Sequence, residues 1–178
     1  MSKILIMAVG VFFFCATANA QMNTDEIFDG VKKTQKFTTL DLLHMDRSVS
    51  TFSDMVALAN LEVALALADS PHTLFVPTNE AFTEMSIEAF AKLTDPKNRV
   101  KLIDFVKRHY LPKKVQKDDF KESQIVTTDS EEEITVSKSG NTVTIGGAEI
   151  VKGDIETSDG VIHIVDRIIE PTSDVVGG

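Results

Sequence analysis

The spacing of the apolar residues changes within this chain, and that change constrains the fold more than any other feature. In the first part, apolar side chains recur three or four residues apart, as in Ile103 and Val106, which is the period of an amphipathic helix. From Gln124 on, they recur every second residue, as in Ile134 and Val136, which is the period of a half-buried strand. Helices followed by strands predict an α+β fold.

Capping residues divide the first part of the chain into several short helices. Asp95 followed by Pro96 predicts a helix start, because an acidic capping residue precedes a proline at the first helical position. Pro112 ends that helix, since proline lacks the N–H that would continue it. Ser53 is placed to cap an earlier helix. The helix after Pro96 has an apolar stripe formed by Val100, Ile103 and Val106, with Leu102 and Phe105 beside it.

Strand signals occur once within the helical part and repeatedly after it. Residues 73–76 form a β-branched and aromatic run that predicts a strand, after which Thr78 and Asn79 are placed to cap a helical turn. Residues 139–141 predict a hairpin turn between two alternating segments. Residues 161–169 are largely apolar on both faces, which predicts the longest strand, central in the sheet.

Residues 1–20 have the features of a cleavable secretory signal peptide. A basic start precedes an apolar run over residues 4–16, and Ala18 and Ala20 give the small-x-small pattern that predicts cleavage after Ala20. A membrane anchor or a buried helix is one alternative, although the run is shorter than the roughly 20 residues that span a bilayer and a polar, charged segment follows it directly. Lipidation of Cys15 is another, although phenylalanines rather than small residues precede that cysteine. We therefore expect a secreted or periplasmic protein, without membrane insertion after cleavage.

Charge and cysteine content narrow the class of protein. Cleavage after Ala20 removes one of 18 basic residues and none of the 27 acidic ones, so the remaining charge is 17 − 27, or −10. This charge disfavours nucleic acid and anionic lipid as partners, and Lys113 with Lys114 is the best candidate for a local basic patch. The single cysteine, Cys15, leaves with the signal peptide, so the exported domain must be stable without disulfides. Together with the absence of an Asn-x-Ser/Thr sequon, these features favour a bacterial origin.

Few residues in the sequence point to catalysis or to metal binding. The sequence contains no G-x-S-x-G, no H-E-x-x-H and no phosphate-binding glycine loop. Its four histidines are not spaced as metal ligands, and His163 and Asp166, three residues apart on a predicted strand, point to opposite faces. The acidic run at 129–133 lacks the spaced oxygens and the glycine of an EF-hand loop, which indicates a solvated loop. We expect no catalytic residue, no cofactor and no metal.

Four segments resemble the blocks of one known family and occur in the same order. Residues 73–82 (TLFVPTNEAF) and 158–171 (SDGVIHIVDRIIEP) are similar to the two signature blocks of the fasciclin, or FAS1, domain. Residues 109–112 (HYLP) resemble the family's Tyr-His block, although an arginine occupies the tyrosine position. Residues 59–61 (ANL) resemble the Ala-Gly-Leu that joins two early helices in the family. The resemblance implies the FAS1 fold, a β-sandwich or wedge of two sheets with several short helices in the N-terminal half.

With the signal peptide, the resemblance divides the chain into residues 1–20, an N-terminal tail or short helix (21–36), a FAS1 domain (37–171) and a flexible C-terminal tail (172–178). FAS1 domains are typically extracellular binding modules and generally not enzymes, which implies adhesion or interaction with a protein or glycan at the cell surface or matrix. We expect a monomer. The family motifs imply structural roles, such as helix capping, a tight turn and bonds to backbone carbonyls, for seven residues: Thr78, Asn79, His109, Pro112, Asp159, Gly160 and His163.

One dipeptide is a candidate for partner binding. In some animal FAS1 domains an Asp-Ile pair near the final strands is linked to integrin recognition, and Asp154 with Ile155 occupies a similar place here. Lys152 and Gly153 precede this pair, which gives the Lys-Gly-Asp tripeptide of some integrin ligands. The alternative is a turn between strands in which Gly153 supplies a permissive backbone. Because the sequence favours a bacterial origin, we do not predict integrin binding for this chain.

Two other function classes remain open. The first is a periplasmic carrier of a small molecule or glycan, which needs an apolar pocket with a few converging polar groups. The second is a hydrolase that uses a serine with His109 or His163, although no pattern that orients a base accompanies them. A closed pocket in the structure favours the carrier, whereas an exposed apolar patch favours contact with another protein.

Overall fold

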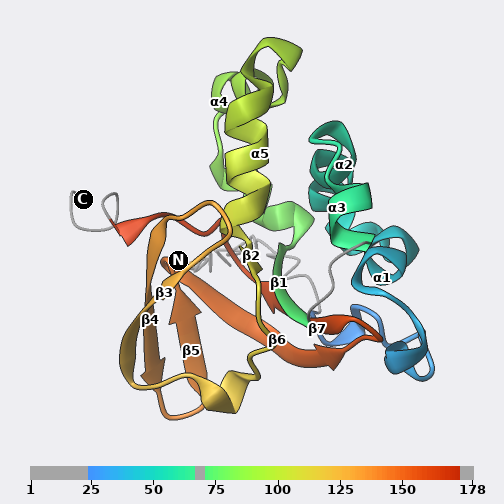
Figure 1. The fold of residues 1–178 in the computed structure, drawn as a ribbon, viewed down its shortest axis with the longest axis vertical. Helices are drawn as coiled ribbons and strands as arrows, with labels where there is room; N and C mark the ends of the chain where they lie inside the picture. Colours follow the sequence, from blue (N-terminus) through green and yellow to red (C-terminus); the bar gives the residue numbers. More distant parts are fainter. Residues whose placement is uncertain (1–23, 67–70, 173–178) are drawn as a thin grey trace, which may run out of the picture.

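The computed structural model describes residues 24–66 and 71–172, whose arrangement is shown in Figure 1. The predicted signal peptide and nearly all of the predicted C-terminal tail lie outside these ranges. The α-helices are α1 (Thr39–Met45), α2 (Ser50–Leu58), α3 (Glu62–Ala66), α4 (Ile87–Thr94) and α5 (Arg99–Arg108). The 3-10 helices are η1 (Thr24–Glu26), η2 (Thr34–Lys36), η3 (Arg47–Val49), η4 (Asn79–Glu84), η5 (Pro96–Asn98) and η6 (Lys117–Asp119). Within the described ranges, no helix is long and apolar enough to cross a membrane.

The strands form one mixed sheet. They are β1 (His72–Pro77), β2 (Tyr110–Leu111), β3 (Ser123–Thr127), β4 (Glu133–Ser139), β5 (Thr142–Ile145), β6 (Ala148–Glu156) and β7 (Gly160–Val165). Their order is β2-β1-β7-β6-β5-β4-β3, in which β1 and β7 are parallel and all other neighbours are antiparallel. Among the described residues, every helix precedes the run of strands β3–β7, so the prediction of an α+β fold is confirmed.

The two expected sheets are the two parts of this one bent sheet, joined where β5 pairs with β6 (Figure 1). The bend brings its two edges toward each other. The Asp129 N–H, just after edge strand β3, donates to the Tyr110 carbonyl on edge strand β2 over 3.0 Å. The sheet is therefore nearly closed, and its inner face is shielded from water.

Strand β7 is central, as its apolar pattern predicts, because it pairs with both β1 and β6 and all six of its residues are buried. The prediction that it is the longest strand and extends to Ile169 is wrong. Strand β7 ends at Val165, and β6 is longer, with nine residues. Beyond β7, the Ile169 N–H donates to a side chain, the His109 ring, instead of to a neighbouring strand.

Two hydrophobic clusters hold the fold together. One packs the helices against β1 and β7 and includes Phe52, Leu74 and Ile162. The other lies inside the bent sheet and includes Phe75 and Ile134. A fully buried large apolar side chain contributes about 2 kcal/mol relative to an exposed one, so these clusters can stabilise residues 24–66 and 71–172, which contain no cysteine, without a disulfide.

The segment at 21–36 differs from the expected tail or single short helix. Its described part contains η1 and η2, and Ile27 and Phe28 are buried in the cluster beneath the helices. The Phe28 N–H donates to the Asp46 carboxylate over 2.8 Å, and Lys152 on β6 donates to the Ile27 carbonyl over 2.7 Å. These contacts make the segment part of the domain.

A neighbouring capping residue determines the start of the helical segment that leads into α5, but not the start of α2. Asp95 accepts from the Lys97 N–H over 2.9 Å with Pro96 at the first position of η5, which leads directly into α5, as predicted. The prediction that Ser53 caps a helix is wrong, because α2 begins at Ser50 and its cap comes from a distant segment, described below. Local sequence alone does not contain that information.

Candidate functional site

His109 is fully buried at the end of α5, where it joins this helix to the segment after β7. Its Nδ1 lies 2.9 Å from the Phe105 carbonyl, and its Nε2 accepts the Ile169 N–H over 3.2 Å. Because Nε2 accepts, the ring proton resides on Nδ1 and is donated to Phe105. Burial lowers the pKa of His109 from 6.5 to about 4, so the ring is neutral at neutral pH. Both ring nitrogens are engaged within the protein.

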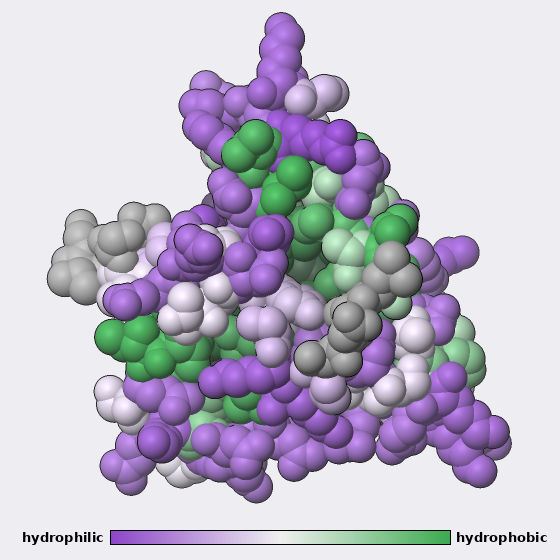
Figure 2. All heavy atoms as spheres, viewed as in Figure 1, coloured by the Kyte–Doolittle hydropathy of each residue, from purple (hydrophilic) through white to green (hydrophobic). Residues whose placement is uncertain are grey.

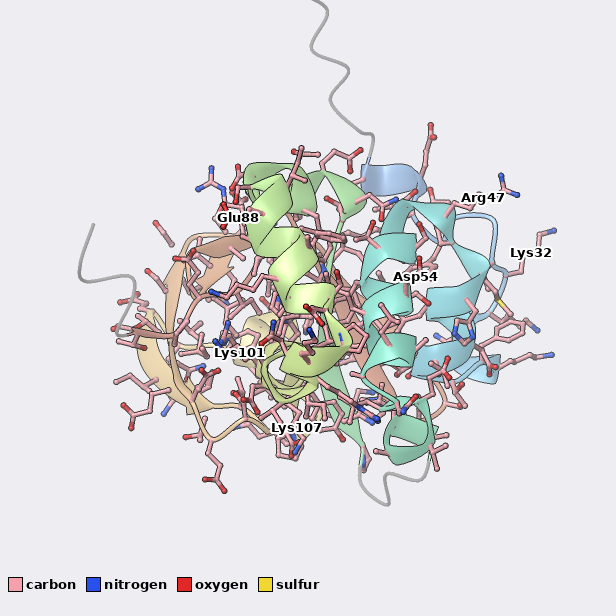
Figure 3. All side chains as sticks on the ribbon, turned by 90° about the horizontal axis from the view of Figure 1, so that it is seen from above. Lys32, Arg47, Asp54, Glu88, Lys101 and Lys107 are labelled. Carbon is pink, nitrogen blue, oxygen red and sulfur yellow. The ribbon has the colours of Figure 1, made fainter. Side chains whose placement is uncertain are left out.

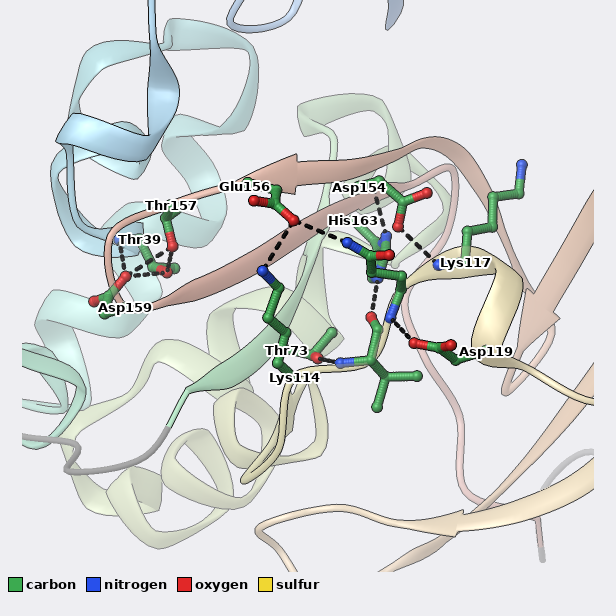
Figure 4. A network of polar contacts seen from close by, with 12 residues as sticks. Thr39, Thr73, Lys114, Lys117, Asp119, Asp154, Glu156, Thr157, Asp159 and His163 are labelled. Carbon is green, nitrogen blue, oxygen red and sulfur yellow. Dashed lines mark hydrogen bonds and ion pairs between the residues drawn. The ribbon is translucent and has the colours of Figure 1, made fainter.

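His163, at the centre of β7, has the opposite tautomer. Its Nδ1 accepts the Asp154 N–H over 3.1 Å, so the proton resides on Nε2, which donates to the Val115 carbonyl over 2.9 Å (Figure 4). Burial lowers the pKa of this ring as well. Asp166 points elsewhere and accepts the Glu149 N–H over 2.7 Å, which agrees with the expected opposite orientations. His163 therefore connects the sheet to the segment that crosses it.

Asp154 and Ile155 lie at an irregularity in β6 where the pairing register with β7 shifts. Asp154 has a left-handed backbone, with φ of 58°, and its carboxylate accepts the Lys117 N–H over 2.7 Å. Ile155 is only 8% exposed and packs in the cluster beneath the helices. Of the two residues predicted to bind a partner, only Asp154 has an exposed side chain, and its carboxylate already holds the loop at Lys117.

Residues 113–119 form a strap across β1 and β6, shown in Figure 4. The Thr73 hydroxyl donates to the Lys113 carbonyl and accepts the Val115 N–H, each over 2.8 Å. Lys114 forms an ion pair with Glu156 over 2.9 Å, and Gln116 donates to the same carboxylate oxygen over 2.8 Å. The predicted basic patch at Lys113 and Lys114 therefore lies in a segment whose second lysine is already paired with an acid.

Asp159 does more than form the turn before β7. One carboxylate oxygen accepts the Thr39 N–H, the Thr39 hydroxyl and the Thr157 hydroxyl, all within 2.9 Å (Figure 4). These bonds tie the start of α1 to the turn. Gly160 is required at this turn, because an added Cβ would lie 2.2 Å from the His72 carbonyl oxygen.

The same cluster places a hydroxyl, a carboxylate and an imidazole together, but not in the order of a hydrolase. The Thr39 hydroxyl lies between the two other groups, 2.9 Å from Asp159 and 3.1 Å from His72 Nε2. In a catalytic triad the histidine lies between the acid and the nucleophile. Thr39 and His72 are also fully buried, so no substrate reaches the hydroxyl.

The two residues predicted to cap a helical turn after β1 have different surroundings. Thr78 occupies the capping position of η4, but its side chain accepts no capping hydrogen bond. The Asn79 side chain instead accepts the Thr51 N–H over 3.0 Å and donates to the Arg47 carbonyl over 2.8 Å. Asn79 thus caps α2, 28 residues earlier in the chain. Pro112 is exposed directly after β2.

A groove lies between α3 and α5, and Figure 2 shows hydrophobic residues gathered between α5 and the α2–α3 pair. We call it the apolar groove; its volume is about 240 Å³. An ion pair of 3.1 Å between Lys107 and Asp129 lies on its rim. The lining consists of Leu61, Ala64, Leu65, Leu74, Val106, Lys107, Tyr110 and Asp129.

Large apolar side chains on α2, α3 and α5 are exposed to solvent. Leu58 on α2 is 54% exposed, Val63 on α3 is 67% exposed and Val100 on α5 is 71% exposed. Val100 lies on the groove side of α5, because Lys107, seven residues later on the same helix face, lines the groove. Arg99 beside it reaches the Ala59 carbonyl on the other wall over 3.4 Å. The sequence predicted the Val100 stripe but not its exposure.

Comparisons with known proteins assign a family and a fold. The family model described as the fasciclin domain matches residues 47–171. The chain is 29% identical over 157 residues to protein sll1483 of Synechocystis, with 86% of each chain covered. It is 24% identical over 161 residues to a protein of Plasmodium falciparum named heme ligase, with 77% of this chain and 78% of that protein covered.

A solved structure of a FAS1 domain pair from the insect cell adhesion molecule fasciclin I has the same fold, with a TM-score of 0.58. Its sequence identity is 20%, and the match covers 78% of this chain and 52% of that chain. The expected FAS1 fold is therefore confirmed. Within residues 24–66 and 71–172, no group of three or more His, Cys, Asp or Glu side chains is arranged to hold a metal ion.

Proposed function

We propose that this chain, which belongs to the fasciclin domain family, is exported and acts as a non-catalytic binding module that contacts a partner protein at the cell surface or matrix. The solved neighbour with this fold belongs to a cell adhesion molecule, which supports an interaction role. The signal-peptide pattern of residues 1–20 supports export. The apolar groove between α3 and α5 is the observation on which the choice of a protein partner rests.

The size and surroundings of the apolar groove favour side chains of a protein over a free small molecule. Its volume of about 240 Å³ is below the roughly 300–1,000 Å³ of pockets that enclose drug-sized ligands. Exposed apolar side chains also occur on α2, α3 and α5, and exposed apolar surface of this kind is typical of a face that another protein covers. Tyr110 and the Lys107–Asp129 pair give it a polar rim. A partner would insert one or two apolar side chains here, and a carrier role is less well supported at this groove.

The buried polar groups support a non-catalytic role. His109 and His163 each use both ring nitrogens in internal hydrogen bonds, so neither has a free nitrogen for proton transfer. The similarity to a protein named heme ligase makes hemin the first substrate to test. We expect the purified domain to leave the absorption spectrum of hemin unchanged over time.

The test of the binding surface is one charged substitution with a matched control. Val100→Asp places a carboxylate on the side of α5 that faces the apolar groove, whereas Ile87→Asp places one at the start of α4, where Ile87 is 90% exposed outside the groove. Proteins captured from the native envelope or medium by the wild-type domain should be lost with Val100→Asp and retained with Ile87→Asp. Equal capture by all three proteins would contradict a role for the groove.

Export is tested separately, by the N-terminal sequence of the mature protein. The N-terminal sequence of the protein recovered from the periplasm or medium is expected to begin at Gln21. Recovery of the uncleaved chain in the cytoplasm alone would refute export while leaving the binding test unaffected.

A further inference from the structure

Basic residues are concentrated in one segment of this acidic chain. Residues 92–108, from the end of α4 through α5, contain six of the chain's 18 basic residues and two of its 27 acidic ones. The segment therefore has a charge of +4, whereas the whole chain has a charge of −9. Such a local reversal of sign attracts anionic groups to one place on a surface that otherwise repels them.

Three of these basic residues converge on a second groove, which we call the cationic groove. It lies between α4, α5 and the segment at 168–171 and has a volume of about 360 Å³. Its cations are Lys92, Lys101 and Arg108, and Glu170 is the only acidic residue in its lining. Its apolar lining includes Met85, Leu93, Phe105 and Ile168.

The three cations are not equally available to a partner. Arg108 already forms a two-pronged pair with Glu132, with Nη2 2.9 Å from Oε1. Lys92 and Lys101 are exposed, and within the described ranges neither forms an ion pair. Two uncompensated ammonium groups thus border an apolar surface, each on a different helix.

We propose that the cationic groove binds an acidic segment of a partner protein, with an apolar side chain on Met85, Leu93 and Phe105 and flanking carboxylates paired with Lys92 and Lys101. Charged groups around an apolar centre are the usual anatomy of a protein contact. An anionic bilayer is a poorer fit, because the net negative chain would be repelled from it and a flat surface would not enter the groove.

This site is separate from the apolar groove. Viewed from above in Figure 3, Lys101 lies on the side of α5 that faces away from Asp54 of α2, whereas the apolar groove lies on the α2–α3 side. The two grooves have no lining residue in common. A substitution that abolishes binding at one groove therefore leaves the lining of the other groove unchanged.

A short acidic peptide tests the proposal directly. The probe is a fluorescein-labelled peptide with two glutamates on each side of a leucine, and two comparison peptides replace the glutamates by glutamine or the leucine by alanine. Binding to the wild-type domain is measured by fluorescence anisotropy at low salt. Methyl NMR spectra show whether the signals of Met85, Leu93 and Ile168 shift. Sedimentation with phosphatidylglycerol vesicles tests the bilayer.

Single charge reversals separate the groove from general attraction. Lys92→Glu and Lys101→Glu should each weaken binding of the glutamate peptide about fivefold, whereas Lys97→Glu, in the same basic segment but outside the lining, should change it less than twofold. The glutamine and alanine peptides should bind more weakly than the probe. The proposal is overturned if Lys97→Glu has an equal effect, if the glutamine peptide binds as well, if the methyl signals do not shift, or if only vesicles are bound.

Discussion

Acidification should destabilise this domain well before its carboxylates are protonated, because His109 is buried in its neutral form. The folded-state pKa of His109 is lowered to about 4, whereas the unfolded ring titrates near its usual value of 6.5. Between these values the unfolded chain binds a proton that the folded chain does not, so stability is complete above about pH 6.5 and falls as the pH is lowered to about 4. At about 1.36 kcal/mol per pKa unit, the total loss is about 3 kcal/mol.

Nearby charges do not reverse this sign. Burial is the largest influence on His109, and Arg108 lowers the pKa further, whereas the Phe105 carbonyl and Glu132 raise it by less than burial lowers it. The pKa of His163 is lowered in the same direction, also by burial, so its contribution adds to the loss. A decrease of about 3 kcal/mol is a large share of the roughly 5–15 kcal/mol by which domains are stable.

Urea unfolding, followed by circular dichroism at several values between about pH 7.5 and pH 4.5, measures this loss. His109→Gln removes the titrating ring, so its free energy of unfolding should be lower at neutral pH but decrease less on acidification. His44→Gln, which changes a half-exposed histidine, is the matched control and should retain the wild-type decrease. A free energy of unfolding that is constant over this range, or an unaltered slope in His109→Gln, would refute the argument.

Two further substitutions test the polar contacts that join distant segments. Asp159→Ala removes the acceptor of three hydrogen bonds from Thr39 and Thr157, so the free energy of unfolding should fall by about 2–4 kcal/mol in urea titrations. Asp118→Ala, at a 93% exposed carboxylate, should change it by less than about 1 kcal/mol. Asn79→Ala removes the cap of α2 and should cost about 1–2 kcal/mol, with faster hydrogen exchange at the Thr51 amide than elsewhere in α2.

The parts of the fold that sequence predicts well are those in which neighbouring residues determine the structure. Asp95 and Pro96 set the start of the helical segment that leads into α5 by contacts within three residues. The alternation of β4 and β5 around Gly140 gives their hairpin, because the turn and the two strands are adjacent in the chain. In these places the local preference and the final fold agree, so the sequence pattern is sufficient to predict the element.

Contacts between distant segments explain where the sequence predictions fail. Ser53 is a good capping residue in isolation, but Asn79 caps α2 from beyond β1, and this cannot be inferred from either segment alone. Ile27 and Phe28 are two apolar residues in a polar stretch, and they are buried where Asp46 and Lys152 hold their backbone against the domain. Sequence reasoning has no access to such pairings.

Helix α5 shows why the two candidate grooves could not be predicted from the sequence. Leu102, Phe105 and Val106 are buried, whereas Val100 in the predicted apolar stripe is exposed. An apolar stripe on a helix usually faces the core, so periodicity cannot tell the exposed end of a stripe from the buried one. The sequence did contain one indication of an exposed apolar surface, namely the width of the apolar surface on α5. This surface includes a second row of apolar residues beside the stripe and is wider than a single contact with the core requires.

The ends of the helical segment around α5 and its exposed middle have different roles. Asp95 holds the start of the segment that leads into the helix and His109 holds its end, both through hydrogen bonds that the fold requires. Val100 and Lys101 lie between these ends on adjacent faces of the helix, where their side chains are exposed and make no contribution to the core. Substitutions at such positions change what the helix contacts at little cost in stability, since surface changes usually shift it by about 0.5 kcal/mol or less. A single scaffold can therefore acquire different partners while its buried histidines and turns stay the same.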